Sequence, residues 1–166
     1  TQYWESNNAC THNLMSLSVK NNVKKIIYLS STSYYGAEDN ISLIYPLKKS
    51  SPTLSMVAEQ QNINTNSDNV YYSISKVIGE QIIAAYSITG LIQSYILRIW
   101  PVREPGIFAP YNSDIPIHVD IRNVLQAIGL CIELNSKKMY HVYNVTDMIE
   151  TVDISDTINI LGYNPI

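Results

Sequence analysis

Three short apolar runs limit most strongly what this chain can fold into. They occupy residues 24–30 (KKIIYLS), 94–100 (SYILRIW) and 139–145 (MYHVYNV). None of them alternates apolar with polar residues, and such runs are typical of strands that are buried on both faces of a parallel sheet. Segments with helical spacing lie before, between and after them, at 2–20, 72–88, 120–135 and 151–161. The alternation of helix and strand predicts an α/β fold with a parallel sheet.

Each predicted helix carries an apolar stripe that we expect to face the core. The stripes are Trp4, Ala9, Cys10, Leu14, Leu17 and Val19; Ile74, Val77, Ile78, Ile82 and Ala85; Val124, Ala127, Ile128 and Cys131; and Ile154, Ile158 and Leu161. Gly90 and Gly162 stand where a glycine commonly ends a helix. Residues 37–69 are polar and include Pro46 and Pro52, so this stretch is predicted to be mostly loop.

Composition narrows the class of protein. A chain of 166 residues without internal repeats suits one domain, and 46% hydrophobic residues exclude a disordered tail. The net charge of -3 gives no electrostatic reason to expect nucleic acid or an anionic membrane. Cys10 and Cys131 have no His or Cys partner at metal-ligand spacing. We therefore expect no metal site, and two reduced, buried thiols in a cytoplasmic protein.

A tyrosine and a lysine four residues apart, Tyr72 and Lys76, are the first candidates for chemistry. On a helix these positions share a face, and an ammonium beside a phenol stabilises the phenolate. Lowering a tyrosine pKa from about 10 to about 7 takes roughly 4 kcal/mol, which requires a partly desolvated cleft. The chain has 13 tyrosines, so such a pair can arise by accident, and taken alone it favours an ordinary amphipathic turn.

A run of small hydroxyl residues, SSTSYYG at 30–36, follows the first predicted strand directly. The carboxyl edge of a parallel sheet is where open α/β proteins bind ligands. A serine at that edge can hydrogen-bond a substrate oxygen and a phenol together. The alternative is turn chemistry, in which Ser and Thr satisfy backbone groups and Gly36 allows a kink.

The order and spacing of these segments resemble the extended short-chain dehydrogenase/reductases, the NAD-dependent epimerases and dehydratases that act mainly on nucleotide sugars. The matching segments are NNACTHNLM (7–15), IIYLSSTSYYG (26–36), YYSISKVIGE (71–80), SYILRIWPVREPG (94–106), IHVDIRNV (117–124) and YHVYNVTD (140–147). Cys10 replaces a usual Gly, Arg103 and Glu104 replace a Tyr-Gly pair, and Ile121 and Arg122 disturb the fifth segment.

The resemblance implies a role for each matching residue. Tyr72 would be the catalytic acid/base, Lys76 would bond the nicotinamide ribose and lower the tyrosine pKa, and Ser31 would orient the substrate. The implied cofactor contacts are Asn7, Ser30, Tyr72, Lys76 and Trp100. Pro101 stands where the family has a substrate-contacting Asn, and it lacks the amide that makes that contact. The alternative for Trp100 is a core aromatic residue at a strand end.

The glycine-rich turn that cradles a dinucleotide pyrophosphate is missing from this sequence. Since that turn opens the family's fold, the resemblance implies a partial domain with an incomplete, Rossmann-like (doubly wound) sheet. Residues 1–100 would be its later portion, and 101–166 would mix sheet elements with a reduced substrate-binding part. The stretch between Gly106 and Ile117 is short for that part. Because the phosphate-cradling turn is missing, we expect residues 1–166 alone to bind NAD poorly.

Three functional readings follow from these observations. The first is an NAD- or NADP-dependent epimerase, dehydratase or reductase that acts on a nucleotide-sugar-like alcohol or ketone. The second is a non-catalytic relic or interaction module of the same fold. The third is a plain α/β binding domain. The resemblance also implies a homodimer through the helices at 2–20 and 72–88, and no nucleic-acid or membrane partner.

Overall fold

A three-stranded parallel sheet forms the centre of the protein. The computed structural model describes residues 2–37, 42–61, 69–104, 118–147 and 150–166. The strands lie in the order β1-β2-β5, with bounds β1 (Lys25–Ser31), β2 (Gln93–Ile99) and β5 (Tyr140–Val145). Both pairs of neighbouring strands are parallel. The predicted α/β fold with a parallel sheet is confirmed, and all three predicted strands form it.

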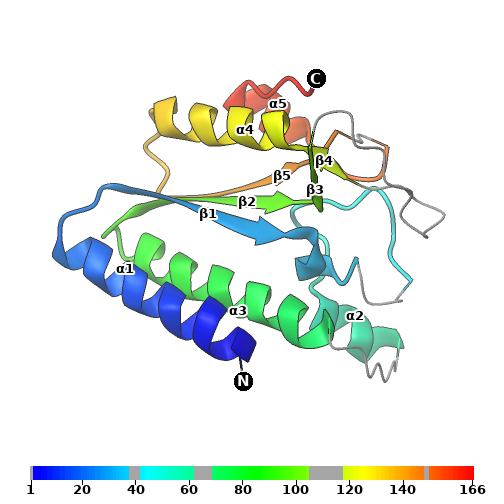
Figure 1. Cartoon of the computed structure of the whole chain (residues 1–166), viewed down its shortest axis with the longest axis horizontal. Coiled ribbons are helices and arrows are strands. Elements are labelled where there is room, and N and C mark those ends of the chain that lie inside the picture. Colours follow the sequence, from blue (N-terminus) through cyan, green and yellow to red (C-terminus); the bar gives the residue numbers. More distant parts are fainter. Residues whose placement is uncertain (1, 38–41, 62–68, 105–117, 148–149) are drawn as a thin grey trace.

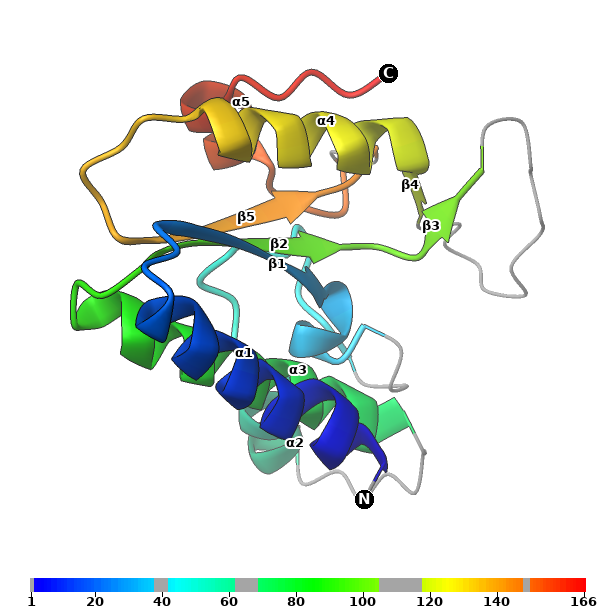
Figure 2. The ribbon, with the colours of Figure 1, turned by 60° about the vertical axis from the view of Figure 1, so that its left-hand side comes forward.

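Helices cover both faces of the sheet, as in doubly wound folds (Figure 1). One face carries η1 (Trp4–Ala9), α1 (Cys10–Lys20) and α3 (Asn69–Ile88). The other face carries α4 (Ile121–Glu133) and α5 (Ser155–Leu161) (Figure 2). The remaining elements are η2 (Thr32–Tyr35), α2 (Leu54–Gln61) and a small parallel pair, β3 (Val102–Arg103) with β4 (Val119–Asp120). Within the described ranges, no helix is both long and apolar enough to cross a bilayer.

Alternate residues of each strand serve the two faces. Tyr95 and Leu97 of β2 belong to the larger apolar cluster, which also contains residues of α4 and α5. Ile96, between them, belongs to a smaller cluster with Met15 of α1 and Ile83 of α3. Both faces of β2 are therefore buried, as its apolar run predicts.

The expectation that β1 is buried on both faces is wrong for this chain. Most of β1 is half-buried, and the Leu29 side chain is 40% exposed. The reason is its place in the described sheet, where β1 is an edge strand and pairs only with β2. Its last two residues, Ser30 and Ser31, are buried nonetheless.

The first helix spans the predicted range, but it turns a different face inward. Trp4, Leu14 and Leu17 are 58%, 58% and 57% exposed, and Cys10 is exposed as well. The residues that it buries are Asn8, Thr11, Met15 and Ser18. The predicted burial of Cys10 is therefore wrong, because this helix packs its small and polar side against α3.

The second helix shows the same departure. Of the predicted stripe, Ala85 is exposed and the four other residues are half-buried. The buried residues of α3 are Ser73, Ser75, Gly79, Glu80, Ile83, Ala84 and Ser87. Small and hydrogen-bonding side chains thus form most of the contact between α3 and the rest of the protein.

The remaining helical predictions have mixed outcomes. In α4, Val124, Ala127 and Cys131 are buried as predicted. The last helix begins at Ser155, later than expected, and Ile158 is exposed although Ile154 and Leu161 are buried. Gly90 and Gly162 adopt left-handed φ angles of 76° and 79° after their helices, as predicted.

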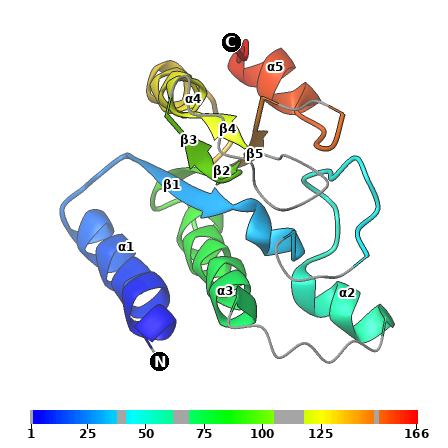
Figure 3. The ribbon, with the colours of Figure 1, turned by 45° about the vertical axis from the view of Figure 1, so that its right-hand side comes forward.

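The stretch predicted to be mostly loop contains a helix, α2, which lies beside the start of α3 (Figure 3). The helix begins directly after Pro52 and Thr53, a proline and a hydroxyl residue that commonly stand at a helix start. That signal was available in the sequence and was outweighed by the surrounding polar residues. The segment between Gly106 and Ile117, predicted to be short for substrate binding, lies outside the described residues.

Candidate active site

A pocket opens at the carboxyl ends of β1 and β2, with a volume of about 490 Å³. Its described lining is Leu29, Ser30, Ser31, Tyr72, Lys76, Ile99, Trp100, Pro101 and Val102. All predicted site residues except Asn7 are among them. Segments that lie far apart in the sequence therefore meet at the edge of the sheet where open α/β proteins bind ligands.

Lys76 is held between two tyrosine rings. Its Nζ lies 5.5 Å from the ring centroid of Tyr28 and 5.4 Å from that of Tyr72. The same Nζ donates a hydrogen bond of 3.3 Å to the carbonyl oxygen of Leu29. Burial lowers the pKa of Lys76, and the negative charge of Glu80 opposes this shift. The ammonium thus stands beside the predicted catalytic phenol in partly desolvated surroundings.

Ser31 is the last residue of β1 and caps the short helix η2. Its Oγ accepts a hydrogen bond of 3.1 Å from the backbone N–H of Ser33 and lies 2.9 Å from the Ser33 Oγ. Gly36, with a φ of 85°, ends η2. The turn chemistry considered for this segment is therefore present, and the same serine also lines the pocket.

Asn7 is not among the described residues that line the pocket, but it is linked to Tyr72 through Ser75. Its side-chain amide donates to the Ser75 Oγ at 2.9 Å, and Ser75 in turn donates to the carbonyl oxygen of Tyr72 at 2.6 Å. Asn8 donates to the Ser75 carbonyl at 3.0 Å. Tyr3 meets Tyr72 edge to face, with ring centroids 5.7 Å apart. This end of the N-terminal helix supports the turn of α3 that carries Tyr72.

The hydroxyl of Ser30, a residue of the pocket lining, is bonded to a buried ion pair that the sequence analysis missed. The Ser30 Oγ donates to the Glu80 Oε1 at 2.5 Å. Glu80 pairs with Arg98, whose Nη2 lies 2.7 Å from Oε2. Burial disfavours the charge of Arg98, but the hydrogen bonds and charge of Glu80 outweigh it and raise the pKa of Arg98.

Further contacts link the ion pair to β5. Arg98 stacks on the ring of Tyr34, 3.5 Å from its centroid, and donates to the Tyr35 hydroxyl at 2.7 Å. Tyr35 donates to the Asn144 side chain at 2.8 Å. A sequence signal for this network existed, because an arginine inside an apolar strand and a glutamate inside an apolar helix both need a buried partner.

Trp100 satisfies both readings of the sequence. It belongs to the larger apolar cluster and also lines the pocket. Its indole N–H is buried and has no hydrogen-bond partner among the described residues. Pro101 follows it in the pocket wall and offers no N–H of its own. The wall opposite Tyr72 and Lys76 is thus largely apolar.

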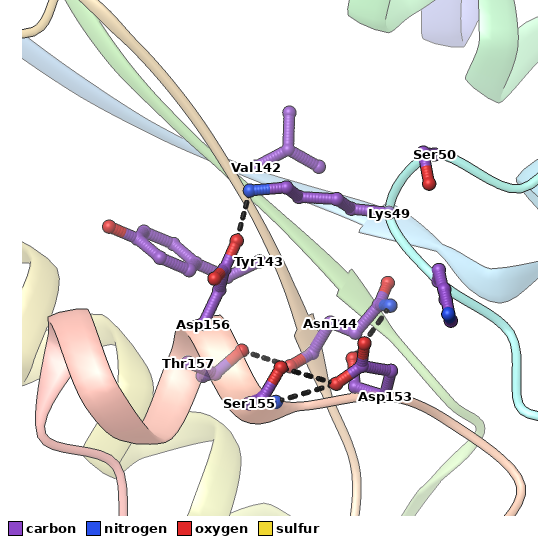
Figure 4. A pocket seen from close by; sticks show the side chains of 10 residues that line it. Lys49, Ser50, Val142, Tyr143, Asn144, Asp153, Ser155, Asp156 and Thr157 are labelled. Carbon is purple, nitrogen blue, oxygen red and sulfur yellow. Dashed lines mark hydrogen bonds and ion pairs between the residues drawn. The ribbon is translucent and has the colours of Figure 1, made fainter.

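A second, smaller pocket of about 270 Å³ lies beside β5, and the sequence analysis did not predict it. Figure 4 shows it between the loop that carries Lys49 and the start of α5. Lys49 forms an ion pair with Asp156 there, and Asp153 accepts hydrogen bonds from Ser155. None of the predicted site residues lines it. Across the described ranges, no three His, Cys, Asp or Glu side chains are grouped as metal ligands.

The fold and the first pocket, which is lined by Ser31, Tyr72 and Lys76, define a Rossmann-like protein with a tyrosine and a lysine at the carboxyl edge of its sheet. The particular family follows from comparison of sequences. The chain belongs to the NAD dependent epimerase/dehydratase family, whose sequence model matches residues 1–153. The predicted family is therefore confirmed. A search of curated proteins found no match.

Solved structures of similar fold agree with this assignment. MoeE5 in complex with UDP-glucuronic acid and NAD superposes with a TM-score of 0.75 at 15% identity, over 99% of this chain and 67% of that one. UDP-glucuronic acid 4-epimerase from Bacillus cereus in complex with NAD gives 0.71 at 15% identity, over 98% and 63%. A mutated uronate dehydrogenase gives 0.70 at 17%, over 99% and 53%. The chain thus spans between about half and two thirds of these proteins.

Proposed function

We propose that the pocket at the carboxyl edge of the sheet is the acid–base centre of an NAD-dependent epimerase, dehydratase or reductase. Its substrate would be a nucleotide-sugar-like alcohol or ketone, in a cytoplasmic protein. One observation carries the proposal: Ser31 of β1 and the pair Tyr72 and Lys76 of α3 line one pocket. Similar folds crystallised with UDP-glucuronic acid and NAD support the choice of substrate class and cofactor.

Each of the three side chains has a chemical task in this proposal. The Tyr72 phenolate takes the proton from a substrate hydroxyl, and Lys76 stabilises the negative charge of the phenolate. The Ser31 hydroxyl, fixed at the end of β1, hydrogen-bonds the reacting oxygen and orients it. NAD, when bound, supplies the hydride acceptor.

The residues present fit one end of this cofactor. Tyr72, Lys76 and Trp100 line the pocket and would hold the nicotinamide end, and the buried indole N–H of Trp100 has no hydrogen-bond partner among the described residues. The pyrophosphate end needs a glycine-rich turn that this sequence does not contain. Catalysis by this proposal therefore requires a nucleotide-binding turn that these 166 residues do not supply.

The test is the exchange Tyr72→Phe in the full-length protein, supplied with NAD and nucleotide sugars, UDP-glucuronic acid first. Loss of the hydroxyl removes the acid/base, so turnover should fall by about 100-fold or more. The unfolding midpoint should stay the same, because the ring keeps its contacts with Tyr3 and Lys76. The control is Tyr71→Phe, at the exposed neighbouring tyrosine, which should turn over normally. Full activity in the Tyr72 variant would exclude the proposed role.

A second candidate function, pairing with another copy of the chain, is favoured by the outer side of the N-terminal helix. Trp4, Leu14 and Leu17 are more than half exposed there, and Tyr71 of α3 is exposed as well. We propose that η1, α1 and α3 form a homodimer interface, in which these apolar side chains become buried. An interaction module without catalysis would use the same surface.

The dimer proposal predicts a change of molar mass. Leu14→Glu together with Leu17→Glu should convert a dimer into a monomer in light scattering, because each charge would be buried without a partner. Ile160→Glu is the matched control, since Ile160 is similarly exposed but lies on α5, on the other face of the sheet. A monomeric wild-type chain at high concentration would contradict the dimer.

A further inference from the structure

One row of side chains runs across the sheet near the carboxyl ends of its three strands. Ser30, Arg98 and Asn144 are register partners on β1, β2 and β5. All three are buried, and Ser30 and Arg98 both contact Glu80 of α3. A single carboxylate thus joins α3 to two strands at the edge of the sheet where the predicted catalytic residues lie.

Both carboxylate oxygens of Glu80 have buried partners. Oε1 accepts from the Ser30 Oγ at 2.5 Å and from the Arg98 Nε at 3.0 Å. Oε2 accepts from the Arg98 Nη2 at 2.7 Å. The Glu80 side chain is only 1% exposed, so the carboxylate is fixed in place and water does not screen its charge.

Glu80 and Lys76 hold the same short piece of β1. Lys76 donates to the carbonyl oxygen of Leu29, and one helical turn later Glu80 accepts from the hydroxyl of the next strand residue, Ser30. These two contacts fix α3 against β1 directly before Ser31. They therefore set the position of Tyr72 and Lys76 relative to that serine.

We propose that Glu80 is a positioning residue for Lys76: its carboxylate anchors α3 to β1, and its negative charge lies one helical turn from the Lys76 side chain. The catalytic meaning of this coupling rests on the function proposed above. The coupling itself is a property of the chain that is measurable without turnover. Glu80 is not among the described residues that line the pocket, and it is bonded to one of them, Ser30, so it acts on the pocket through Ser30 and Lys76.

The titratable and charged groups around Lys76 determine how its pKa would respond to removal of the Glu80 charge. Tyr28 faces Lys76 from β1, Tyr72 faces it from α3, and Glu80 lies one turn further along the same helix. Arg98 of β2 lies on the far side of Glu80. Burial lowers the pKa of Lys76 and Glu80 raises it, so a neutral side chain at position 80 would lower that pKa further.

The experiment measures the reactivity of single lysines in the whole chain. Acetic anhydride labels only the neutral amine, and mass spectrometry reports each site at a series of pH values. In Glu80→Gln we expect the labelling of Lys76 at pH 9 to rise by roughly threefold or more, because a larger fraction is neutral. Lys25 is the internal reference, since it is bonded to backbone carbonyls at the opposite end of the sheet.

Three further variants separate charge from structure. Glu80→Asp keeps the carboxylate, so the labelling of Lys76 should stay near the wild-type rate. Glu80→Gln with Arg98→Met removes the whole ion pair without leaving a lone buried charge, and the labelling of Lys76 should remain raised. Tyr35→Phe loses hydrogen bonds at the far end of the network, so stability should fall while Lys76 stays unchanged.

The possible outcomes distinguish the proposal from a purely structural role. A wild-type labelling profile of Lys76 in both Gln-containing variants would overturn it. So would an equal rise at Lys25 and Lys76, because loosening of the whole fold exposes both amines. An active Tyr72→Phe enzyme would instead refute the proposed function, while the measured coupling of Glu80 to Lys76 would still stand.

Discussion

The two faces of the sheet are covered by helices of opposite character. On one face, α4 buries Val124, Ala127 and Cys131 against the larger apolar cluster. On the other face, the fully buried residues of α3 are mainly serines, a glycine and Glu80; Ile83 belongs to the smaller apolar cluster, and half-buried Val77 packs against the larger one. The same three strands thus have an apolar interface on one side and a largely hydrogen-bonded one on the other.

The two interfaces contribute differently to the folded protein, one mainly to its stability and the other mainly to the position of the candidate site residues. Apolar burial is non-directional and contributes most of the favourable free energy of folding. Hydrogen bonds and a buried ion pair add little net stability, but they allow few alternative arrangements. The α4 face therefore mainly stabilises the fold, while the α3 face fixes where Tyr72 and Lys76 lie relative to Ser31.

The largest expected effect comes from a larger side chain in the apolar interface between α4 and the sheet. Ala127 is fully buried, so Ala127→Leu should lower the free energy of unfolding by about 1–3 kcal/mol through overpacking. Urea titration measures this loss. The labelling of Lys76 in the folded protein should not change, because α4 does not contact the pocket. A changed Lys76 would show that the two faces are not independent.

Two glycines, one on α3 and one on α4, give a second test of the comparison with a smaller expected effect. A Cβ at Gly79 would lie 2.5 Å from the Tyr28 hydroxyl oxygen, whereas a Cβ at Gly129 would meet nothing within 4 Å. Gly129→Ala should therefore stabilise the chain by about 0.5–1 kcal/mol through helix propensity. Gly79→Ala should be less stable than Gly129→Ala and should alter the labelling of Lys76, which rests on the Tyr28 ring. Equal unfolding midpoints would contradict the close approach of α3 to β1.

The smallest expected effect is a pH dependence on the apolar face. His141 is stacked between Tyr95 and Tyr143, with ring centroids 4.6 and 5.9 Å away. Burial lowers the pKa of His141, so below about pH 6.5 the unfolded chain binds a proton that the folded chain resists. Stability should fall as the pH drops from 7.5 to 5.5. His141→Phe should flatten this part of the urea-midpoint profile, and an unchanged slope would argue against the effect.

The contrast between the faces also explains which parts of the fold were predictable. Apolar periodicity placed α4 correctly in both range and orientation, because that helix packs by apolar burial. The same rule gave the ranges of α1 and α3 but the wrong inward faces, since Met15 and Ile83 are accompanied there mainly by small and polar residues, serines above all. Cys10 was misplaced for that reason.

At the candidate site, the resemblance predicted the pocket better than the supporting contacts. Linear motifs placed Ser31, Tyr72 and Lys76 at one pocket, because Ser31 ends β1 and the other two lie in the first half of α3. The network of Glu80 and Arg98 could not be assembled in the same way. Its members meet through strand register and helix packing, which no local pattern encodes.

The six-residue π-helical segment η1 has a consequence for chain length. Such a segment holds one more residue than the regular helix would need over the same rise. Shortening it by a single residue would restore regular winding, and the residues before it would keep their place around the helix axis. Tyr3 would then stay beside the Tyr72 ring. Natural variants should therefore tolerate a one-residue deletion in η1 more readily than one in the regular helix α1, where the loss of a residue turns everything before it by about 100°.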